Sequence, residues 1–244
     1  MRRAIRAGAA TLATVLLSIL AVVVVPTAAH ASGCTLPPCG AFANHTSQSI
    51  TVRWSNDNDG WTYATVAPGQ TKGGWTNDGI DVDFFLVPTG CVAIGTVPTD
   101  GSFTYYGPAG WDKIASTETV SISSISCRDG YVYAWADAAD VWSAASQGWA
   151  ACRWYYNDAN WGDNCGGFRN IASTLQNNSS AGNSVNFYYS PSYGGAWACL
   201  SAGDVWRNLA AGKIFSWGSG LGGYWQSIND DIASSKFVST CGVS

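Results

Sequence analysis

The chain has 244 residues and a formal net charge of −4, with 16 acidic against 12 basic residues. This acidic balance argues against nucleic acid or an anionic membrane surface as a partner, because both attract basic patches. Strong helix formers are scarce, and Trp, Tyr, Thr, Val, Ser and Gly are plentiful, a composition typical of short strands joined by tight turns rather than long helices.

The first 31 residues have the features of a signal peptide. Three arginines near the start precede an apolar run over residues 9–25, and the small residues Ala29 and Ala31 mark a cleavage point after Ala31. A membrane anchor is the alternative. The run is marginal in length for a hydrocarbon core of about 30 Å, however, and the small-residue exit favours cleavage. We therefore expect residues 1–31 to be removed and the rest to be secreted to the extracellular space, without a membrane segment.

Residues 32–127 form the first predicted module. Apolar and polar residues alternate with period two in three runs, at residues 49–54, 80–87 and 119–123. Residues 67–70 read Ala-Pro-Gly-Gln, which places Pro and Gly at the two central positions of a type II turn. Strands at this spacing, with turns between them, predict a β-sandwich-like module of unknown role.

All eight cysteines lie after the predicted cleavage point. An even number of cysteines in an exported chain predicts disulfide bonds. A zinc site is the weaker interpretation, because the sequence has no Cys-x-x-Cys pair and His45 is the only histidine after residue 31. In the C-terminal module, Cys152–Cys165 and Cys199–Cys241 are candidate pairs, although four cysteines allow three pairings. The eight residues are Cys34, Cys39, Cys91, Cys127, Cys152, Cys165, Cys199 and Cys241.

Residues 128–244 form the second predicted module, which contains an internal repeat. Residues 152–174 align without a gap with residues 213–235, and both segments carry Ile-Ala-Ser near their end. Two copies of about 45–50 residues, each with four strand-like runs, predict a pair of Greek keys. The alignment matches Trp154 with Phe215, Tyr156 with Trp217, Gly162 with Gly223 and, further upstream, Tyr133 with Tyr188 and Trp142 with Trp197.

The second copy carries a spaced aromatic motif. Tyr188, Tyr193 and Gly195 fit the pattern aromatic-x4-aromatic-x-Gly, and Ser234 follows further along the chain. Together these residues resemble the βγ-crystallin Greek key, so we expect a βγ-crystallin-like double Greek-key module. The resemblance implies a hairpin that folds back on its sheet beneath the two aromatic rings, with Gly195 at a positive φ. The Ser234 hydroxyl would then satisfy backbone groups left unpaired at the bend.

Residues 230–235 also resemble the calcium-binding form of that family, in which two acidic or amide residues precede a Ser/Thr-Ser pair. The resemblance makes Asp230, Asp231 and Ser234 candidate Ca²⁺ ligands, since carboxylate and hydroxyl oxygens are hard donors. The first copy departs from the pattern, because Arg169 aligns with Asp230. Family sites are shared between two such segments, so a purely structural corner is the favoured alternative.

A closer resemblance is to secreted bacterial peptidase inhibitors built on this same fold, typified by an actinobacterial metalloprotease inhibitor. It rests on residues 156–162, 171–178 and 188–195, together with the signal peptide and the cysteines, and it covers the second module only. Such inhibitors present a rigid loop, often held by a disulfide, to the protease cleft, and preorganisation lowers the ordering cost of binding. The resemblance implies a peptidase inhibitor whose partner is an extracellular protease, above all a metalloprotease. It assigns no reactive bond.

Catalytic patterns are missing from the sequence. A Ser-His-Asp site would need His45, which has no nucleophile motif near it, and neither Gly-x-Ser-x-Gly nor His-Glu-x-x-His occurs. Asp81 and Asp83 are candidates for paired carboxylates, but their alternation predicts that both lie on a solvent-facing strand surface. We therefore expect no enzyme activity, and no cofactor other than the candidate Ca²⁺.

Two other functions stay open. An extracellular carbohydrate- or cell-wall-binding module would need an exposed planar row of aromatic rings, for which Trp61, Trp75 and Trp111 beside Gly- and Asp-rich turns are candidates. Burial in the core is the more common fate of a tryptophan. A secreted toxin is the third interpretation, since related families use the crystallin fold in that way.

Overall fold

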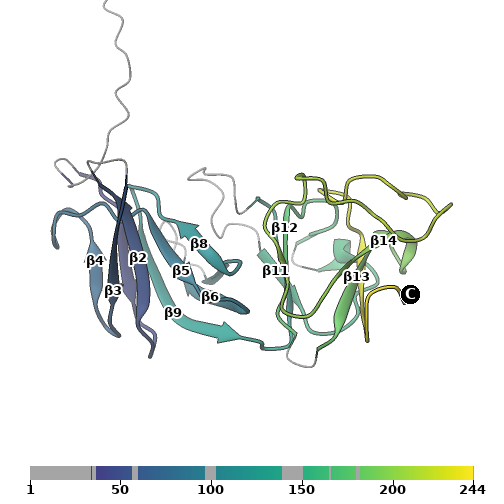
Figure 1. The fold of residues 1–244 in the computed structure, drawn as a ribbon, viewed down its shortest axis with the longest axis horizontal. Coiled ribbons are helices and arrows are strands. Elements are labelled where there is room, and N and C mark those ends of the chain that lie inside the picture. Colours follow the sequence, from purple (N-terminus) through teal and green to yellow (C-terminus); the bar gives the residue numbers. More distant parts are fainter. Residues whose placement is uncertain are drawn as a thin grey trace, which may run out of the picture.

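The computed structural model describes residue 34 and residues 37–56, 60–96, 103–138, 151–164, 166–179 and 182–243. The predicted signal peptide, Trp142 and Cys165 lie outside these residues. Within them the chain is built from strands, and its one helical segment is a 3₁₀ turn at Trp161–Asp163. The all-β fold that the composition predicts is therefore confirmed. Figure 1 shows the strands gathered in two halves that follow each other along the chain.

Two sheets face each other in the first half. Phe42 and Ile122 from one sheet meet Val52 and Phe85 from the other in a buried core, so the half is a sandwich of two sheets. The predicted turn forms, with Gly69 at a φ of 75°. One sheet holds, in order, β4 (Thr71–Gly73), β1 (Ala41–Asn44), β9 (Thr119–Cys127), β6 (Cys91–Thr96) and β7 (Phe103–Tyr106). The other holds β3 (Trp61–Val66), β2 (Ile50–Ser55), β5 (Phe84–Val87) and β8 (Gly110–Lys113).

Two of the three predicted strands form, as β2 and β9, but the third begins only at Phe84. The residues before it are held by polar contacts instead of a strand ladder. The Asp81 carboxylate is buried and accepts hydrogen bonds from the Gly40 amide (2.6 Å) and the Ser116 hydroxyl (2.9 Å). Asp81 and Asp83 therefore do not share a solvent-facing strand surface, and that prediction is wrong.

Two further sheets form the second half, and each combines segments of both copies of the repeat. The first copy contributes three strands to one sheet, which the short β15 of the second copy joins by pairing with β12. The second copy contributes three strands to the other sheet, which Asp158 of the first copy joins by bridging to Ser235. Each copy thus lends an extended segment to the sheet of the other. The strands are β10 (Val132–Trp135), β11 (Ala151–Trp154), β12 (Thr174–Asn177), β13 (Ser184–Ser190), β14 (Gly194–Leu200), β15 (Val205–Trp206) and β16 (Ser234–Val238).

This exchange gives the second half an internal two-fold relation. The Asn170 amide donates to the Ile232 carbonyl at 3.0 Å, and the Asp230 amide donates to the Ala172 carbonyl at the same distance. Asn170 and Asp230 also share a left-handed backbone, with φ of 60° and 57°. Asn170, rather than Arg169, therefore corresponds to Asp230, and the ungapped alignment is one residue out of register at this point.

The ungapped alignment is also wrong further upstream. Val132 of β10 pairs with Trp154 of β11, and Val185 of β13 pairs with Leu200 of β14. Trp154 therefore corresponds to Leu200 and not to Phe215. Likewise Tyr133, next to Val132, corresponds to Asn186 and not to Tyr188. The reason is an insertion, because the second copy carries additional residues after β15 that have no counterpart in the first.

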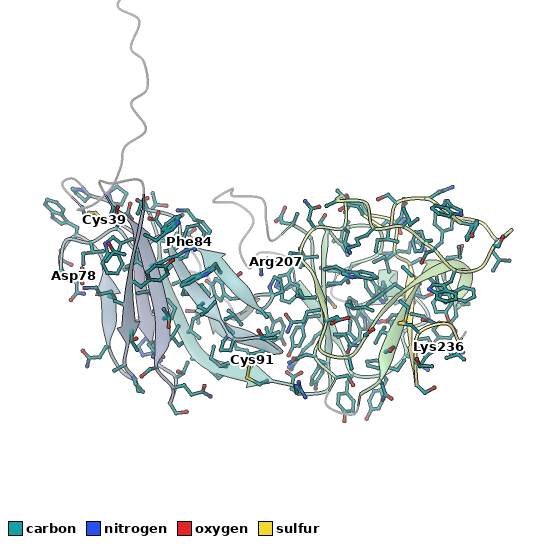
Figure 2. The ribbon with its side chains drawn as sticks, viewed as in Figure 1. Cys39, Asp78, Phe84, Cys91, Arg207 and Lys236 are labelled. Atoms are coloured by element: carbon teal, nitrogen blue, oxygen red, sulfur yellow. A yellow bond between two sulfur atoms is a disulfide. The ribbon has the colours of Figure 1, made fainter. Side chains whose placement is uncertain are left out.

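Side chains of the second half bind backbone groups of the first half where the two meet. Gln176 on β12 donates to the Cys91 carbonyl (2.9 Å) and accepts from the Ala109 amide (2.8 Å). Arg207, directly after β15, donates to the carbonyls of Ala109 (2.6 Å) and Trp111 (3.1 Å). Figure 2 places Arg207 at this junction. One of these bonds is buried and the others are partly buried, and breaking them would leave polar groups unpaired, so they hold the halves together. An apolar cluster beside them comprises Val92, Tyr105, Tyr131, Tyr133, Trp135 and Ala151.

A buried carboxyl group lies next to this junction. Asp112 on β8 is fully buried, and neither of its oxygens has a hydrogen-bond partner among the residues that the structure describes. The Arg207 guanidinium lies 4.0 Å away, beyond hydrogen-bond distance. Burial raises the pKa of Asp112 from 3.8 to about 8, and Arg207 lowers it only in part. Asp112 is therefore mostly protonated at neutral pH.

We expect the folded protein to lose stability as the pH rises from about 4 to about 8. The unfolded chain releases the Asp112 proton near a pKa of 3.8, whereas the folded chain keeps it up to about 8. Asp112→Asn should remove this loss, which amounts to several kcal/mol at about 1.4 kcal/mol per pKa unit. Urea unfolding across this pH range measures the effect. The exposed Asp163→Asn is the control, and equal pH slopes in Asp112→Asn and the parent would contradict the assignment.

Candidate functional site

The spaced aromatic motif forms a folded hairpin where β13 turns into β14. The Tyr188 and Tyr193 rings pack edge to face at 5.8 Å, and Gly195 takes a φ of 76°. A Cβ on Gly195 would lie 2.9 Å from a backbone carbonyl oxygen, so a larger residue does not fit. The buried Ser234 hydroxyl donates to the Ser190 carbonyl (2.7 Å) and accepts from the Tyr193 amide (3.2 Å). The motif residues thus build a structural corner.

The candidate calcium ligands have different neighbours. The Asp230 carboxylate accepts hydrogen bonds from the Ser173 hydroxyl (3.3 Å) and the Asn229 side-chain amide (2.6 Å), and burial is the main cause of its raised pKa. Asp231 instead lines a hollow with Arg169, and the Ser234 hydroxyl is used by the corner. Within the described ranges, no group of three or more His, Cys, Asp or Glu side chains could hold a metal ion. The calcium site stays a prediction.

The inserted residues of the second copy form a loop, residues 213–228, which we call the tryptophan loop. Its backbone is tied to β14, because the Trp217 amide donates to the Trp197 carbonyl (3.0 Å) and the Trp197 amide to the Trp217 carbonyl (3.1 Å). The fully buried Phe215 anchors the loop in the core. Its exposed large apolar side chains are Trp217 (43%), Leu221 (49%) and Trp225 (66%).

Disulfide bonds form as the cysteine count predicts. Cys199 on β14 is bonded to Cys241, one of the two candidate pairs in the second half. This bond keeps the C-terminal segment beside the tryptophan loop, where a Cβ on Gly242 would lie 3.4 Å from the Trp217 ring. Cys152 is also disulfide-bonded, and Cys165, the other half of its candidate pair, lies outside the described residues. The remaining pairs are Cys34–Cys39 and Cys91–Cys127.

A hollow of about 520 Å³ adjoins the tryptophan loop on the sheet of β13, β14 and β16. Aromatic rings of the folded hairpin line it together with Trp197 and Leu221. Lys236, labelled in Figure 2, gives the hollow a positive charge. Leu221 belongs to both the loop and the lining of the hollow, so the two adjoin each other.

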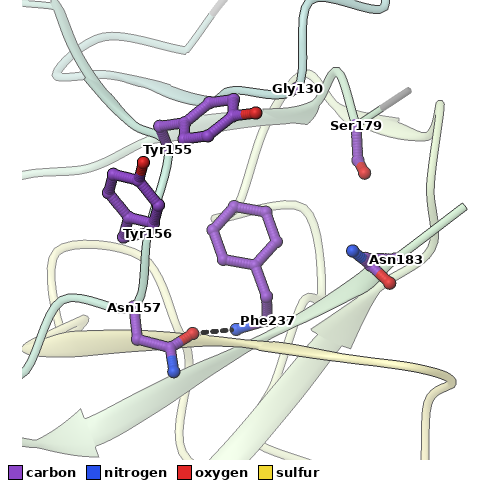
Figure 3. Close-up of a pocket in the computed structure, with 7 residues that line it drawn as sticks. All are labelled: Gly130, Tyr155, Tyr156, Asn157, Ser179, Asn183 and Phe237. Carbon is purple, nitrogen blue, oxygen red and sulfur yellow. Dashed lines mark hydrogen bonds between the residues drawn. The ribbon is translucent and has the colours of Figure 1, made fainter. Parts of the chain in front are cut away.

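A separate hollow of about 390 Å³, which we call the tyrosine pocket, lies where Phe237 points away from β16. Figure 3 shows the Phe237 ring at its centre, with Tyr155 and Tyr156 on one side and Ser179 and Asn183 on the other. The side-chain oxygen of Asn157 accepts a hydrogen bond from the Phe237 amide at 2.8 Å. This bond ties the tyrosine segment of the first copy to a strand of the second. The lining residues are Gly130, Tyr155, Tyr156, Asn157, Ser179, Asn183 and Phe237.

An arginine occupies the aromatic face of the first half. The Arg53 guanidinium lies 4.3 Å from the ring centres of both Trp61 and Trp111, and 4.6 Å from that of Phe84. Trp75 is exposed, but it lies in the turn after β4, which belongs to the other sheet. Trp61, Trp75 and Trp111 therefore do not form the planar row that the carbohydrate-binding interpretation requires.

No family model matches this chain, and no curated protein matches its sequence.

His45, which a Ser-His-Asp site would need, is an exposed residue that follows β1. None of the helical residues that the structure describes could span a membrane. The functional assignment therefore depends on the tryptophan loop with its hollow and on the tyrosine pocket.

Sequence signals for these two surfaces are weak but identifiable. Residues 154–156 are three consecutive aromatic residues, and side chains on a strand alternate between its faces, so at least one ring must leave the core. Asn183 and Phe237, which complete the tyrosine pocket, come from distant segments and carry no local signal. The exposed tryptophans of the loop resemble core residues in the sequence, because only the insertion places them outside.

We expect Ser234→Ala to destabilise the second half by about 1–3 kcal/mol, because it leaves two backbone groups of the folded hairpin unpaired in a buried corner. Chemical denaturation measures this change. The exposed Ser239→Ala serves as the control and should stay within about 0.5 kcal/mol of the parent protein. A Ser234→Ala protein as stable as this control would show that the corner needs no hydroxyl.

For calcium, we expect calorimetry to show no binding at about 1 mM Ca²⁺, since the Ser234 hydroxyl is engaged and the two aspartates have different neighbours. Asp230→Ala is the matched variant for the same titration. A heat of binding in the parent protein that disappears in Asp230→Ala would contradict this expectation and establish the calcium site.

Proposed function

We propose that this protein is a secreted peptidase inhibitor directed at an extracellular metalloprotease, and that the tryptophan loop is its contact surface. The observation that carries the proposal is a loop fixed at its base by buried and hydrogen-bonded residues, with three large apolar side chains exposed beyond it. Large apolar side chains that are exposed on one rigid loop are typical of a surface that binds a partner.

The base of the loop is preorganised in several ways. The amide of Phe215 donates to the Gln226 carbonyl and the amide of Trp225 donates to the Phe215 carbonyl, both at 3.0 Å. Further along, the Ile228 amide donates to the Lys213 carbonyl at 3.1 Å. A loop held by such bonds loses little conformational entropy when it enters a protease cleft, which favours tight inhibition.

The composition of the exposed surface suits a protein partner. Tryptophan and tyrosine are the residues that most often dominate binding energy at protein interfaces, especially beside a pocket that excludes water. Trp217 and Trp225 are exposed on the loop, and the hollow next to it is lined by Tyr193 and Trp197. A protease side chain that filled this hollow would bury the rings that line it, and Leu221 of the loop with them.

The two-fold relation provides a parallel within the chain. Tyr133 on β10 lies opposite Gln176 on β12, and this sheet face holds the first half of the protein. The related pair is Asn186 on β13 opposite Lys236 on β16, on the sheet that carries the tryptophan loop. One outer face is thus covered by the first half. On its counterpart, Asn186 is buried and donates to the Val243 carbonyl of the C-terminal segment (2.6 Å), and Lys236 lines the hollow.

The strand order supports the resemblance to the crystallin-fold inhibitors. In a Greek key the fourth strand returns to lie beside the first. Here β12 lies beside β10, and β16 lies beside β13, while the third extended segment of each copy joins the other sheet. The folded hairpin with its serine corner adds the motif on which the resemblance rests.

Trp225→Ala should weaken inhibition at least about tenfold, because truncation of an aromatic anchor at an interface costs about 2 kcal/mol or more. The measurement is the inhibition constant of the protein without residues 1–31 against a panel of secreted metalloproteases and serine proteases. Trp75→Ala, which removes an exposed tryptophan from the first half, is the matched control. It should leave the inhibition constant unchanged.

Trp225 is exposed, so its removal should not alter the thermal denaturation of the protein. If the parent protein inhibits no protease of the panel at about 1 μM, or if Trp225→Ala inhibits as well as the parent, the proposed role of the loop is wrong.

A further inference from the structure

The tyrosine pocket has a prominent pair of aromatic rings at its edge. Tyr155 and Tyr156 are 50% and 76% exposed, and their ring centres lie 4.9 Å apart with the planes nearly perpendicular. Exposed tyrosines are not unusual alone, but these two also separate the pocket from a neighbouring hollow of about 300 Å³, lined in part by Asp158 and Asn164. The rings therefore form a ridge between two concave surfaces.

The ridge is held in place from below. A Cβ on Gly130 would lie 2.7 Å from the Tyr155 ring, so the ring packs against the backbone in a space that only glycine leaves open. The Tyr131 ring centre lies 5.1 Å from that of Tyr155 on another side. The hydrogen bond from the Phe237 amide to Asn157 holds the following residue. A ligand would meet rings that are already oriented.

The polar groups of the pocket are uncharged. Asn157, Ser179 and Asn183 are its polar side chains, and none of the described residues that line it carries a charge. Amide and hydroxyl groups both donate and accept hydrogen bonds, which is also the property of alcohol groups. A phosphate or carboxylate ligand would find no counter-ion there, and an entirely apolar ligand would leave the amides unpaired.

Rings that stack, together with amides that donate and accept, match a molecule whose faces are C–H surfaces and whose edge carries hydroxyl groups. We propose that the tyrosine pocket binds a short segment of a neutral saccharide, with sugar rings on Tyr155 and Tyr156 and hydroxyl groups on Asn157 and Asn183. The ridge between two hollows suits a chain of several units, which can extend over both. The second hollow is lined by one residue of each charge, Arg153 and Asp158, so it has no formal net charge. This site shares no lining residue with the tryptophan loop or its hollow and does not depend on protease inhibition.

The test is a titration of the protein without residues 1–31 with two neutral probes, cellotetraose and chitotetraose, and one anionic probe, tetragalacturonate. Binding is measured by saturation-transfer NMR and calorimetry. We expect at least one neutral probe to bind with a dissociation constant below about 1 mM. Tyr156→Ala should weaken that binding at least about tenfold through loss of stacking, whereas Tyr156→Phe, which keeps the ring, should stay within about threefold.

Two further variants separate this site from others. Tyr63→Ala removes a tyrosine of similar exposure from the first half, and Trp225→Ala alters the tryptophan loop; both should bind the saccharide like the parent protein. The proposal is overturned if neither neutral probe binds with a dissociation constant below about 1 mM, if only the anionic probe binds, or if Tyr156→Ala binds as well as Tyr63→Ala.

Discussion

The backbone exchange between the two copies of the repeat is the constraint on which the second half depends. Where Asp158 bridges to Ser235, a segment of the first copy is brought against β16, and the tyrosine pocket forms along that contact. Where β15 pairs with β12, the related contact positions Gln176 and Arg207 against the first half. The tyrosine pocket and the contact with the first half therefore both form where an extended segment of one copy pairs with the sheet of the other.

The same constraint explains where the chain tolerates additional residues. The insertion that forms the tryptophan loop follows β15 and ends just before Asp230, whose amide is bound to the carbonyl of Ala172. The exchange therefore fixes both ends of the loop, and Phe215 fills the core between them. A long loop can then project from a rigid frame without loosening it, which is the usual arrangement of binding loops.

Features that depend on neighbouring residues could be predicted from the sequence. The turn at Gly69 and the positive φ of Gly195 follow from local backbone sterics, and the alternating run at β2 follows from strand geometry. Features that depend on distant partners could not. The alternation around Asp81 predicts an exposed strand residue, and only the hydrogen bond from the distant Gly40 amide explains its burial. Similarly, nothing near Arg207 in the sequence indicates that it binds the first half.

The first half covers one sheet face of the second half, and this limits the number of binding surfaces on the second half. A repeat with a two-fold relation has two similar outer faces. Two exposed binding faces on one molecule would allow open-ended assembly of molecules into chains. Contacts of Gln176 and Arg207 cover one of these faces with the first half. Under the proposed function, the remaining face provides a single protease-binding surface per molecule, so this surface alone cannot link two proteases or polymerise the protein, and the tyrosine pocket lies apart from it.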